Sequence, residues 1–117
     1  MMRWLSVTAC VALGSGCAGA PPVPPQRFTD AATDIKAAQD LGAANSPQAK
    51  IHLQQAQDQF EAAKRLSKDE PAVAARKLDT AQAEAALAKS LTTEQATRAE
   101  ADAAKAKLSA LGTGGSR

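Results

Sequence analysis

The sequence predicts an all-α fold, an antiparallel helical hairpin extended to three helices, with a long alanine-rich C-terminal helix. Alanine accounts for 29 of the 117 residues and aromatic residues for 3%, a composition typical of long helices. Apolar residues recur at every third or fourth position from residue 28 onward. Glycine and proline, which interrupt helices, are confined to the two ends and to two short breaks.

Residues 1–16 resemble the signal peptide of a bacterial lipoprotein. Arg3 supplies a positive charge, the run WLSVTACVALG is apolar, and small residues precede Cys17. In lipoproteins, cleavage before the cysteine leaves its thiol to carry the lipid. The usual pattern has a large aliphatic residue where this chain has Gly14. The stretch VTAC, which ends at Cys10, fits that pattern better, but it leaves about six apolar residues, fewer than export requires. Cys17 is therefore the preferred lipidation site.

The same segment has an alternative interpretation as an uncleaved transmembrane helix over residues 4–20. That run is at the lower limit of length for a bilayer span and ends in Gly14, Ser15 and Gly16. If the signal peptide is removed, Cys17 is the only thiol, so we expect no disulfide, no cysteine metal site and no cofactor. In the lipoproteins that the segment resembles, Asp after the cysteine signals inner-membrane retention. Ala18 implies the outer membrane, with the domain facing the periplasm.

Residues 17–27 are expected to form a lipidated, proline-rich linker. Four prolines between residues 21 and 25 remove hydrogen-bond donors and restrict φ, which favours an extended polyproline II conformation. At about 3.1 Å per residue, the segment from residue 18 to 26 would hold the domain roughly 25 to 30 Å from the lipid surface.

The helical domain is expected to span residues 28–111. Its first helix ends at Gly42, a residue suited to the left-handed position after a helix. The second helix has Pro47 in its first turn and Asn45 or Ser46 as its cap. The expected inward face of the first helix is Phe28, Ala32, Ile35, and Ala38 or Gln39. The expected inward face of the second helix is Ala49, Leu53, Ala56, Phe60 and Ala63.

The third helix is expected to follow the break at Pro71, with Asp69 or Glu70 as its cap. No glycine or proline lies between residues 72 and 111, so the helix would be about 60 Å long. Short turns make consecutive helices antiparallel, so the second helix would pack against the first half of the third, and the rest would overhang. Residues 112–117 are expected to be a flexible tail. The inward face would comprise Leu78, Ala81, Ala85 and Ala88, continuing through Gln95, Ala99, Ala103 and Ala106.

Three stretches carry a resemblance to a known family: GAANSPQAK, LQQAQDQFEAAKRL and AARKLDTAQAEAALA. They resemble the bacterial envelope lipoproteins classified as domain of unknown function 4398, over residues 28 to about 108. The family has no known activity, so the resemblance implies an envelope lipoprotein and brings no catalytic residues. Some of its members add a peptidoglycan-binding domain at the C-terminus, for which this sequence offers no residues after Arg117.

The titratable residues favour a protein that is not an enzyme and has no small-molecule substrate. His52 is the only histidine, and positions 48, 49, 55 and 56 hold no metal-ligating residue, so we expect it to be solvated or to pack between helices. The charges are interspersed, with a formal net charge of +2, and form no basic stripe for a nucleic acid. Solvated faces are expected for Glu61, Glu84, Glu94 and Glu100, with the ion pairs Glu61–Arg65 and Glu94–Arg98.

The alanine-rich face of the third helix is the candidate interaction site, because small side chains let helices approach closely. The overhanging part of this helix, from Gln95 to Ala110, could pair with another copy or with an envelope protein, or it could be a solvated single helix. The sequence thus predicts a lipid-anchored periplasmic protein with a structural or protein-interaction role. A second hypothesis is an adaptor or chaperone-like subunit of an envelope or cell-wall complex. The expected interaction face comprises Ala85, Ala88, Leu91, Ala99, Ala103 and Ala106.

Overall fold

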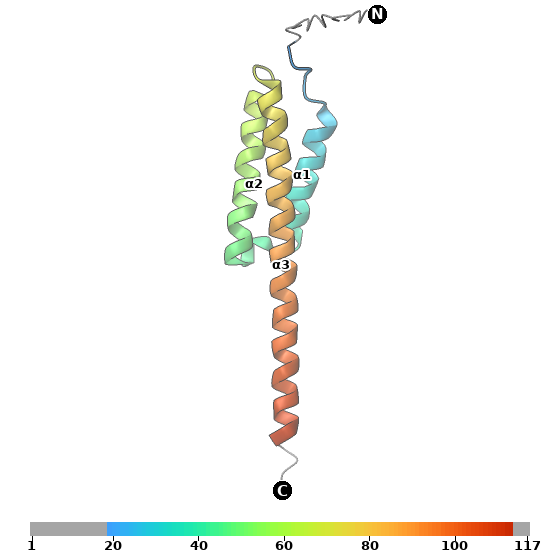
Figure 1. Ribbon diagram of the computed structural model, residues 1–117, viewed down its shortest axis with the longest axis vertical. Helices are drawn as coiled ribbons and strands as arrows, with labels where there is room; N and C mark the ends of the chain where they lie inside the picture. Colours follow the sequence, from blue (N-terminus) through green and yellow to red (C-terminus); the bar gives the residue numbers. More distant parts are fainter. Residues whose placement is uncertain (1–18, 114–117) are drawn as a thin grey trace, which may run out of the picture.

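A computed structural model describes residues 19–113, which form three α-helices and one short 3-10 helix. Their bounds are α1, Pro25–Asp40; η1, Ala43–Asn45; α2, Pro47–Leu66; and α3, Pro71–Thr113. No strand occurs within residues 19–113, and the all-α prediction is confirmed. In Figure 1, α3 lies between α2 and α1, and α2 runs antiparallel to the first half of α3. The predicted signal peptide and Cys17 lie outside the described residues.

Helix α1 begins three residues earlier than the sequence predicts. Pro24 is extended, with φ −60° and ψ 138°, and Pro25 is the first helical residue. The first turn of a helix leaves its N–H groups without partners inside the helix, so a proline there loses no hydrogen bond. The expected linker boundary after residue 27 is therefore wrong, and the extended segment ends at Pro24.

The extended segment lies against the bundle. Val23 is half-buried and packs against the cluster that contains Ala74 and Leu78. Residues 20–24 also line a shallow groove with Pro71, Ala72 and other residues at the start of α3. The expectation of a spacer extended up to residue 26 is wrong, because the apolar side chain of Val23 packs against the apolar surface of the bundle.

Gly42 ends α1 as predicted. Its φ of 88° and ψ of 25° lie in the left-handed region, and its N–H donates to the Gln39 carbonyl over 2.9 Å. The chain then forms η1, an element that the sequence did not predict, and places Ala43 in the core. Ser46 caps α2, since its Oγ accepts from the Ala49 N–H at 3.5 Å.

Replacing Gly42 with alanine is expected to lower the free energy of unfolding by about 1 kcal/mol, because an L side chain disfavours the left-handed conformation. A Cβ at this position would meet only Asn45 Nδ2 at 3.5 Å, an ordinary contact, so the backbone conformation is the cause. Urea unfolding followed by circular dichroism measures the effect. Gly19→Ala is the control, since its Cβ would meet nothing within 4 Å. Equal stability of both variants would contradict the prediction.

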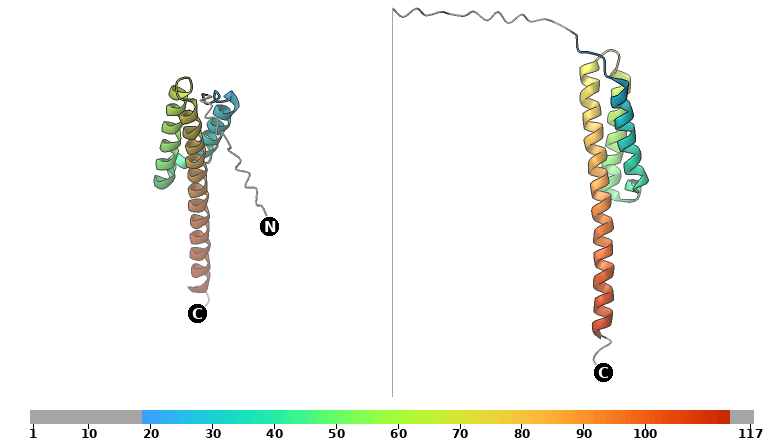
Figure 2. Two further views of the ribbon diagram at one scale, coloured as in Figure 1. Left: turned by 45° about the horizontal axis from the view of Figure 1, so that its top comes forward. Right: turned by 90° about the vertical axis from the view of Figure 1, so that its right-hand side faces the viewer.

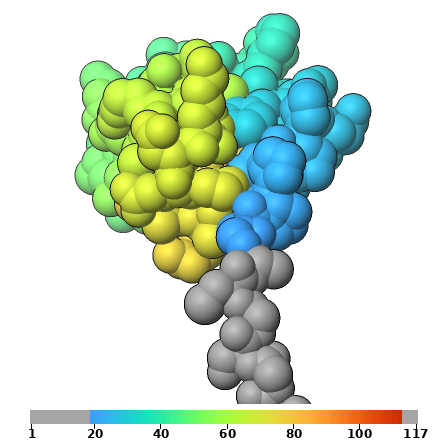
Figure 3. Space-filling model, turned by 90° about the horizontal axis from the view of Figure 1, so that it is seen from above, coloured from blue at the N-terminus to red at the C-terminus, as the bar shows by residue number. Residues whose placement is uncertain are grey.

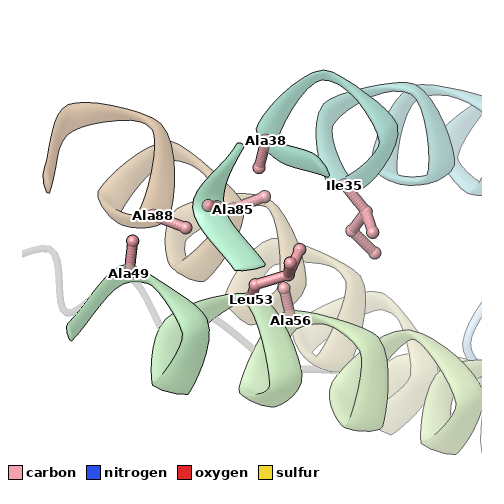
Figure 4. Packing of buried hydrophobic residues seen from close by; sticks show 8 residues of the cluster. Ile35, Ala38, Ala49, Leu53, Ala56, Ala85 and Ala88 are labelled. Carbon is pink, nitrogen blue, oxygen red and sulfur yellow. The ribbon is translucent and has the colours of Figure 1, made fainter. Parts of the chain in front are cut away.

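Alanine dominates the core of the bundle. Of the buried hydrophobic residues in the described chain, only Ile35, Leu53 and Leu78 are not alanine. Figure 4 shows how alanines of the three helices meet around Leu53. The predicted inward faces of α2 and of the first half of α3 are confirmed, with Phe60 partly buried between the two core clusters. Small inward side chains let the helices pack closely. Figure 3 shows the end of the bundle that holds the α2–α3 turn, where the start of α1 lies beside α2 and α3.

The inward face of α1 differs from the prediction at two positions. Ala31, Ile35 and Ala38 are buried, whereas Ala32 and Gln39 are exposed. Alanine occupies both position 31 and position 32, so the hydrophobic pattern does not decide which of them faces the core. The contact with α3 decides it.

The second half of α3 projects beyond the bundle, as predicted. Every residue from 93 to 112 is exposed, and we call this segment the overhang. At about 1.5 Å per residue it extends roughly 30 Å past the end of α2 (Figure 2). The helix continues through Gly112 to Thr113, so the expectation that it ends before residue 112 is wrong. The rest of the expected tail lies outside the described residues.

Candidate functional site

Polar contacts tie α1 to α3 along one edge of the bundle. Asp34 accepts hydrogen bonds from Lys89 Nζ at 3.0 Å and from Gln82 Nε2 at 3.3 Å. Arg27 forms an ion pair with Asp79 on the same pair of helices. These contacts are partly solvated, so they orient the helices more than they stabilise them.

A histidine–glutamate contact joins α2 to α3. His52 Nδ1 lies 2.7 Å from Glu84 Oε2, and the two side chains are 29% and 26% exposed. The expectation that Glu84 is solvated is wrong, and His52 packs between helices. Both residues lie the same number of positions from Lys68 in the turn, so the antiparallel hairpin brings them together. That equal separation is the sequence signal that could have revealed the pair.

We expect His52 and Glu84 to be energetically coupled by about 0.5 to 1.5 kcal/mol, the usual net contribution of a hydrogen bond. A double-mutant cycle of His52→Ala and Glu84→Gln, measured by urea unfolding, gives this coupling. The matched comparison is a cycle of His52→Ala with Glu61→Gln, because Glu61 contacts Lys64 and not His52. Additive effects in both cycles would show that the contact contributes nothing.

Two of the carboxylates for which the sequence predicts solvated faces form ion pairs within their own helix. Glu94 pairs with Arg98 as predicted, whereas Glu61 pairs with Lys64 at 3.2 Å and not with Arg65. Within residues 19–113, no three His, Cys, Asp or Glu side chains are grouped to hold a metal. None of the helices in this range combines the length and apolar composition that a bilayer span requires.

The surface depressions of the described chain are open. One of them is lined by α3 residues alone, from Lys89 to Ala101, so it is the outer surface of a single helix and encloses no cavity. Pockets that bind small molecules are concave and enclose most of the ligand. This surface of α3 does not enclose a ligand in that way.

The structure divides the predicted interaction face in two. Ala85 and Ala88 are fully buried in the core of their own chain, so assigning them to an intermolecular surface was wrong. Leu91 is half-buried and packs against the same cluster. The other three members, Ala99, Ala103 and Ala106, are exposed on the overhang. The hydrophobic period continues through both halves of α3, so only the position of α1 and α2 separates core from surface.

A shallow surface groove lies at the point where the overhang leaves the bundle, and we call it the ledge. On the bundle side it is formed by Leu41, which is 54% exposed, together with Gly42, Asn45 and Ser46. On the α3 side it is formed by residues that include Ala96 and Ala99. The ledge is therefore continuous with the exposed alanines of the overhang.

Two charges on the overhang have no ionic partner among the described residues. Glu100 and Lys107 have only uncharged residues three and four positions away, and neither forms an ion pair within residues 19–113. The other charges pair within the helix, Glu94 with Arg98 and Asp102 with Lys105, the latter at 3.7 Å. Glu100 and Lys107 are two turns apart and lie on the same side of α3.

Comparisons of the chain with protein-family models, with curated proteins and with solved structures find no match.

Proposed function

We propose that this chain is a lipid-anchored periplasmic protein with a structural or protein-interaction role in the cell envelope, and that the overhang is its interaction element. The observation that carries the proposal is the overhang itself, a helical segment of which every residue from 93 to 112 is exposed. A single alanine-rich helix of this length is only marginally stable in water, so a protein partner would stabilise it.

The polarity of the molecule supports this role. The extended segment of residues 19–24 lies at the end of the bundle that holds the α2–α3 turn, and the overhang points the opposite way (Figure 1). Attachment through Cys17 would thus place the anchor and the overhang at opposite ends of the molecule. Because residues 20–24 lie against the bundle, the spacer after Cys17 would be reduced to residues 18 and 19, a reach of about 6 Å.

The anchor rests on the signal-like segment before Cys17 and on the resemblance to envelope lipoproteins. Buried acyl chains contribute about 0.8 kcal/mol per CH₂, and more than one chain gives lasting attachment. Such chains would hold the protein at the outer membrane, the location that Ala18 implies.

The ledge favours a second candidate function, that of an adaptor subunit. A partner lying along the overhang would contact the exposed Leu41 at the same time, so one surface would present both α3 and the end of α1. Cross-linking in cells separates the two functions. A single heterologous partner favours the adaptor, and links between copies favour the structural role.

Replacing Cys17 with serine is expected to abolish lipidation and to release the chain from the membrane fraction, since the thiol is the proposed attachment point. Mass spectrometry of the native protein should find a diacylated cysteine at its N-terminus and no residue before it. The matched variant Cys10→Ser should leave lipidation unchanged. Loss of lipid in Cys10→Ser but not in Cys17→Ser would move the anchor to Cys10. An intact leader, or a bare Cys17 thiol, would refute the anchor.

A further inference from the structure

We propose that the partner of the overhang is a second copy of this chain, bound antiparallel so that each overhang lies along the other and ends at the other's ledge. This inference rests on the interaction role proposed for the overhang. Three observations carry it: the continuity of the α3 face, the position of α1 and α2, and the two unpaired charges.

The exposed face of the overhang continues a face that is already packed. Leu78, Ala81, Ala85 and Ala88 are fully buried under α1 and α2. Steps of three or four residues carry the same face onward through Thr92 and into the overhang. We call this continuation the overhang face, which comprises Ala96, Ala99, Ala103 and Ala106. Helices already pack closely on the first half of the face, so the second half can accept a helix in the same way.

The position of α1 and α2 selects the orientation of the partner. A helix lying parallel on the overhang face would bring its own bundle to the level where α1 and α2 already cover the first half of α3. The two bundles would then compete for the same space. The α3 helix of an antiparallel second copy would end at the level where α1 ends and α2 begins. Its C-terminal end would then contact the ledge at Leu41 and Gly42. Only the antiparallel arrangement covers the overhang face without displacing a helix.

The charges fit the antiparallel register. If Ala103 packs against Ala106 of the second copy, each chain places Glu100 opposite Lys107 of the other, because both residues flank the overhang face on one side. The dimer would therefore form two equivalent ion pairs from the two overhang charges that lack an ionic partner within residues 19–113. Such a self-complementary contact has the two-fold symmetry usual for homodimers.

Cross-linking tests the register directly. The full chain with Cys10→Ser and Cys17→Ser, purified in mild detergent, provides a background without thiols. Two differently tagged forms, Ala99→Cys and Ala110→Cys, should form a mixed disulfide on oxidation, since these positions face each other in the proposed register. Each form alone should link poorly, because two copies of residue 99 would be roughly 16 Å apart along the axis. Efficient linking of residue 99 to itself, or no linking at all, would overturn the proposal.

A charge exchange tests the contact without introducing thiols. Lys107→Glu should weaken dimerisation roughly tenfold, because two attractions become two repulsions. Combining it with Glu100→Lys should restore the dimer. Lys105→Glu is the matched control, because Lys105 lies on the opposite side of α3 from the overhang face. Sedimentation equilibrium of the same detergent-solubilised chains measures the dissociation constants. Equal weakening by Lys107→Glu and Lys105→Glu, or no restoration in the double variant, would overturn the proposal.

The outcomes separate this inference from the proposed function. A monomer whose overhang, carrying a photo-cross-linker at position 103, captures one heterologous envelope protein would refute the antiparallel dimer and leave the interaction role standing. A dimer in the expected register, together with native protein that carries no lipid on Cys17, would support the inference and refute the anchor. Attachment of such a partner through Leu108, which lies on the opposite side of the overhang, would also refute the dimer.

Discussion

Truncation of Leu78 to alanine is expected to lower the free energy of unfolding by about 2 to 5 kcal/mol, the range for a buried leucine. Leu78 is the largest side chain that is fully buried in the described chain. Its cluster contains Ala31, Ala63 and Ala74, whose methyl groups have no rotamers with which to fill a cavity. The loss should therefore lie toward the upper part of that range.

Urea unfolding of the full chain, followed by far-ultraviolet circular dichroism, measures the effect of Leu78→Ala. The matched control is Leu108→Ala, which removes the same atoms from a side chain that is 69% exposed. A surface change of this kind should alter the free energy of unfolding by about 0.5 kcal/mol or less. If the two variants were equally stable, Leu78 would not be a core residue.

Enlargement of Ala85 to leucine is expected to destabilise the bundle by about 1 to 3 kcal/mol through overpacking. Ala85 is fully buried in the cluster that contains Ile35, Ala38 and Ala56, so it faces both α1 and α2 (Figure 4). Three additional carbon atoms have no space there unless a helix moves away from α3. Such a movement would expose alanines that are now completely buried.

The control for Ala85→Leu is Ala101→Leu, which makes the same change at an exposed position of the same helix. Leucine and alanine are both strong helix formers, so the control should stay within about 0.5 kcal/mol of the native chain. A native-like free energy of unfolding for Ala85→Leu would mean that the helices are not closely packed at this level.

The two substitutions probe a core that contains few large side chains. Burial of a leucine or phenylalanine contributes about 1.5 to 3 kcal/mol, whereas an alanine contributes much less. Small domains are stable by only about 5 to 15 kcal/mol, so either variant removes a large fraction of the total. A second chain on the overhang face would add buried area to such a bundle.

Local sequence signals predicted the helices and most of their ends. Gly42 was predicted as a left-handed terminator because that role depends only on its own backbone. The predicted cap was Asn45 or Ser46, and the structure selects Ser46, which accepts from a residue three positions away. The inward faces of α2 and of the first half of α3 followed from hydrophobic period. Pro25 was assigned to the linker because the sequence pattern does not distinguish a proline in an extended run from one in a first helical turn.

Contacts between helices were much harder to predict from the sequence. The choice between Ala31 and Ala32, the docking of Val23 and the pairing of His52 with Glu84 all depend on how one helix lies against another. The predicted interaction face failed at Ala85 and Ala88 for the same reason. Alanine is compatible with a core, a helix interface and an exposed helix surface alike.

The sequence by itself determined that this protein is a set of helices broken at Gly42 and Pro71, because backbone freedom and hydrophobic period act over a few residues. Only the tertiary structure decided which part of the long alanine face is core and which is surface. Helix α2 runs antiparallel to α3 and its first residue, Pro47, lies near the middle of α3, so α2 covers α3 only over its first half. The rest of that face is exposed because the chain supplies no further helix to cover it within the described residues.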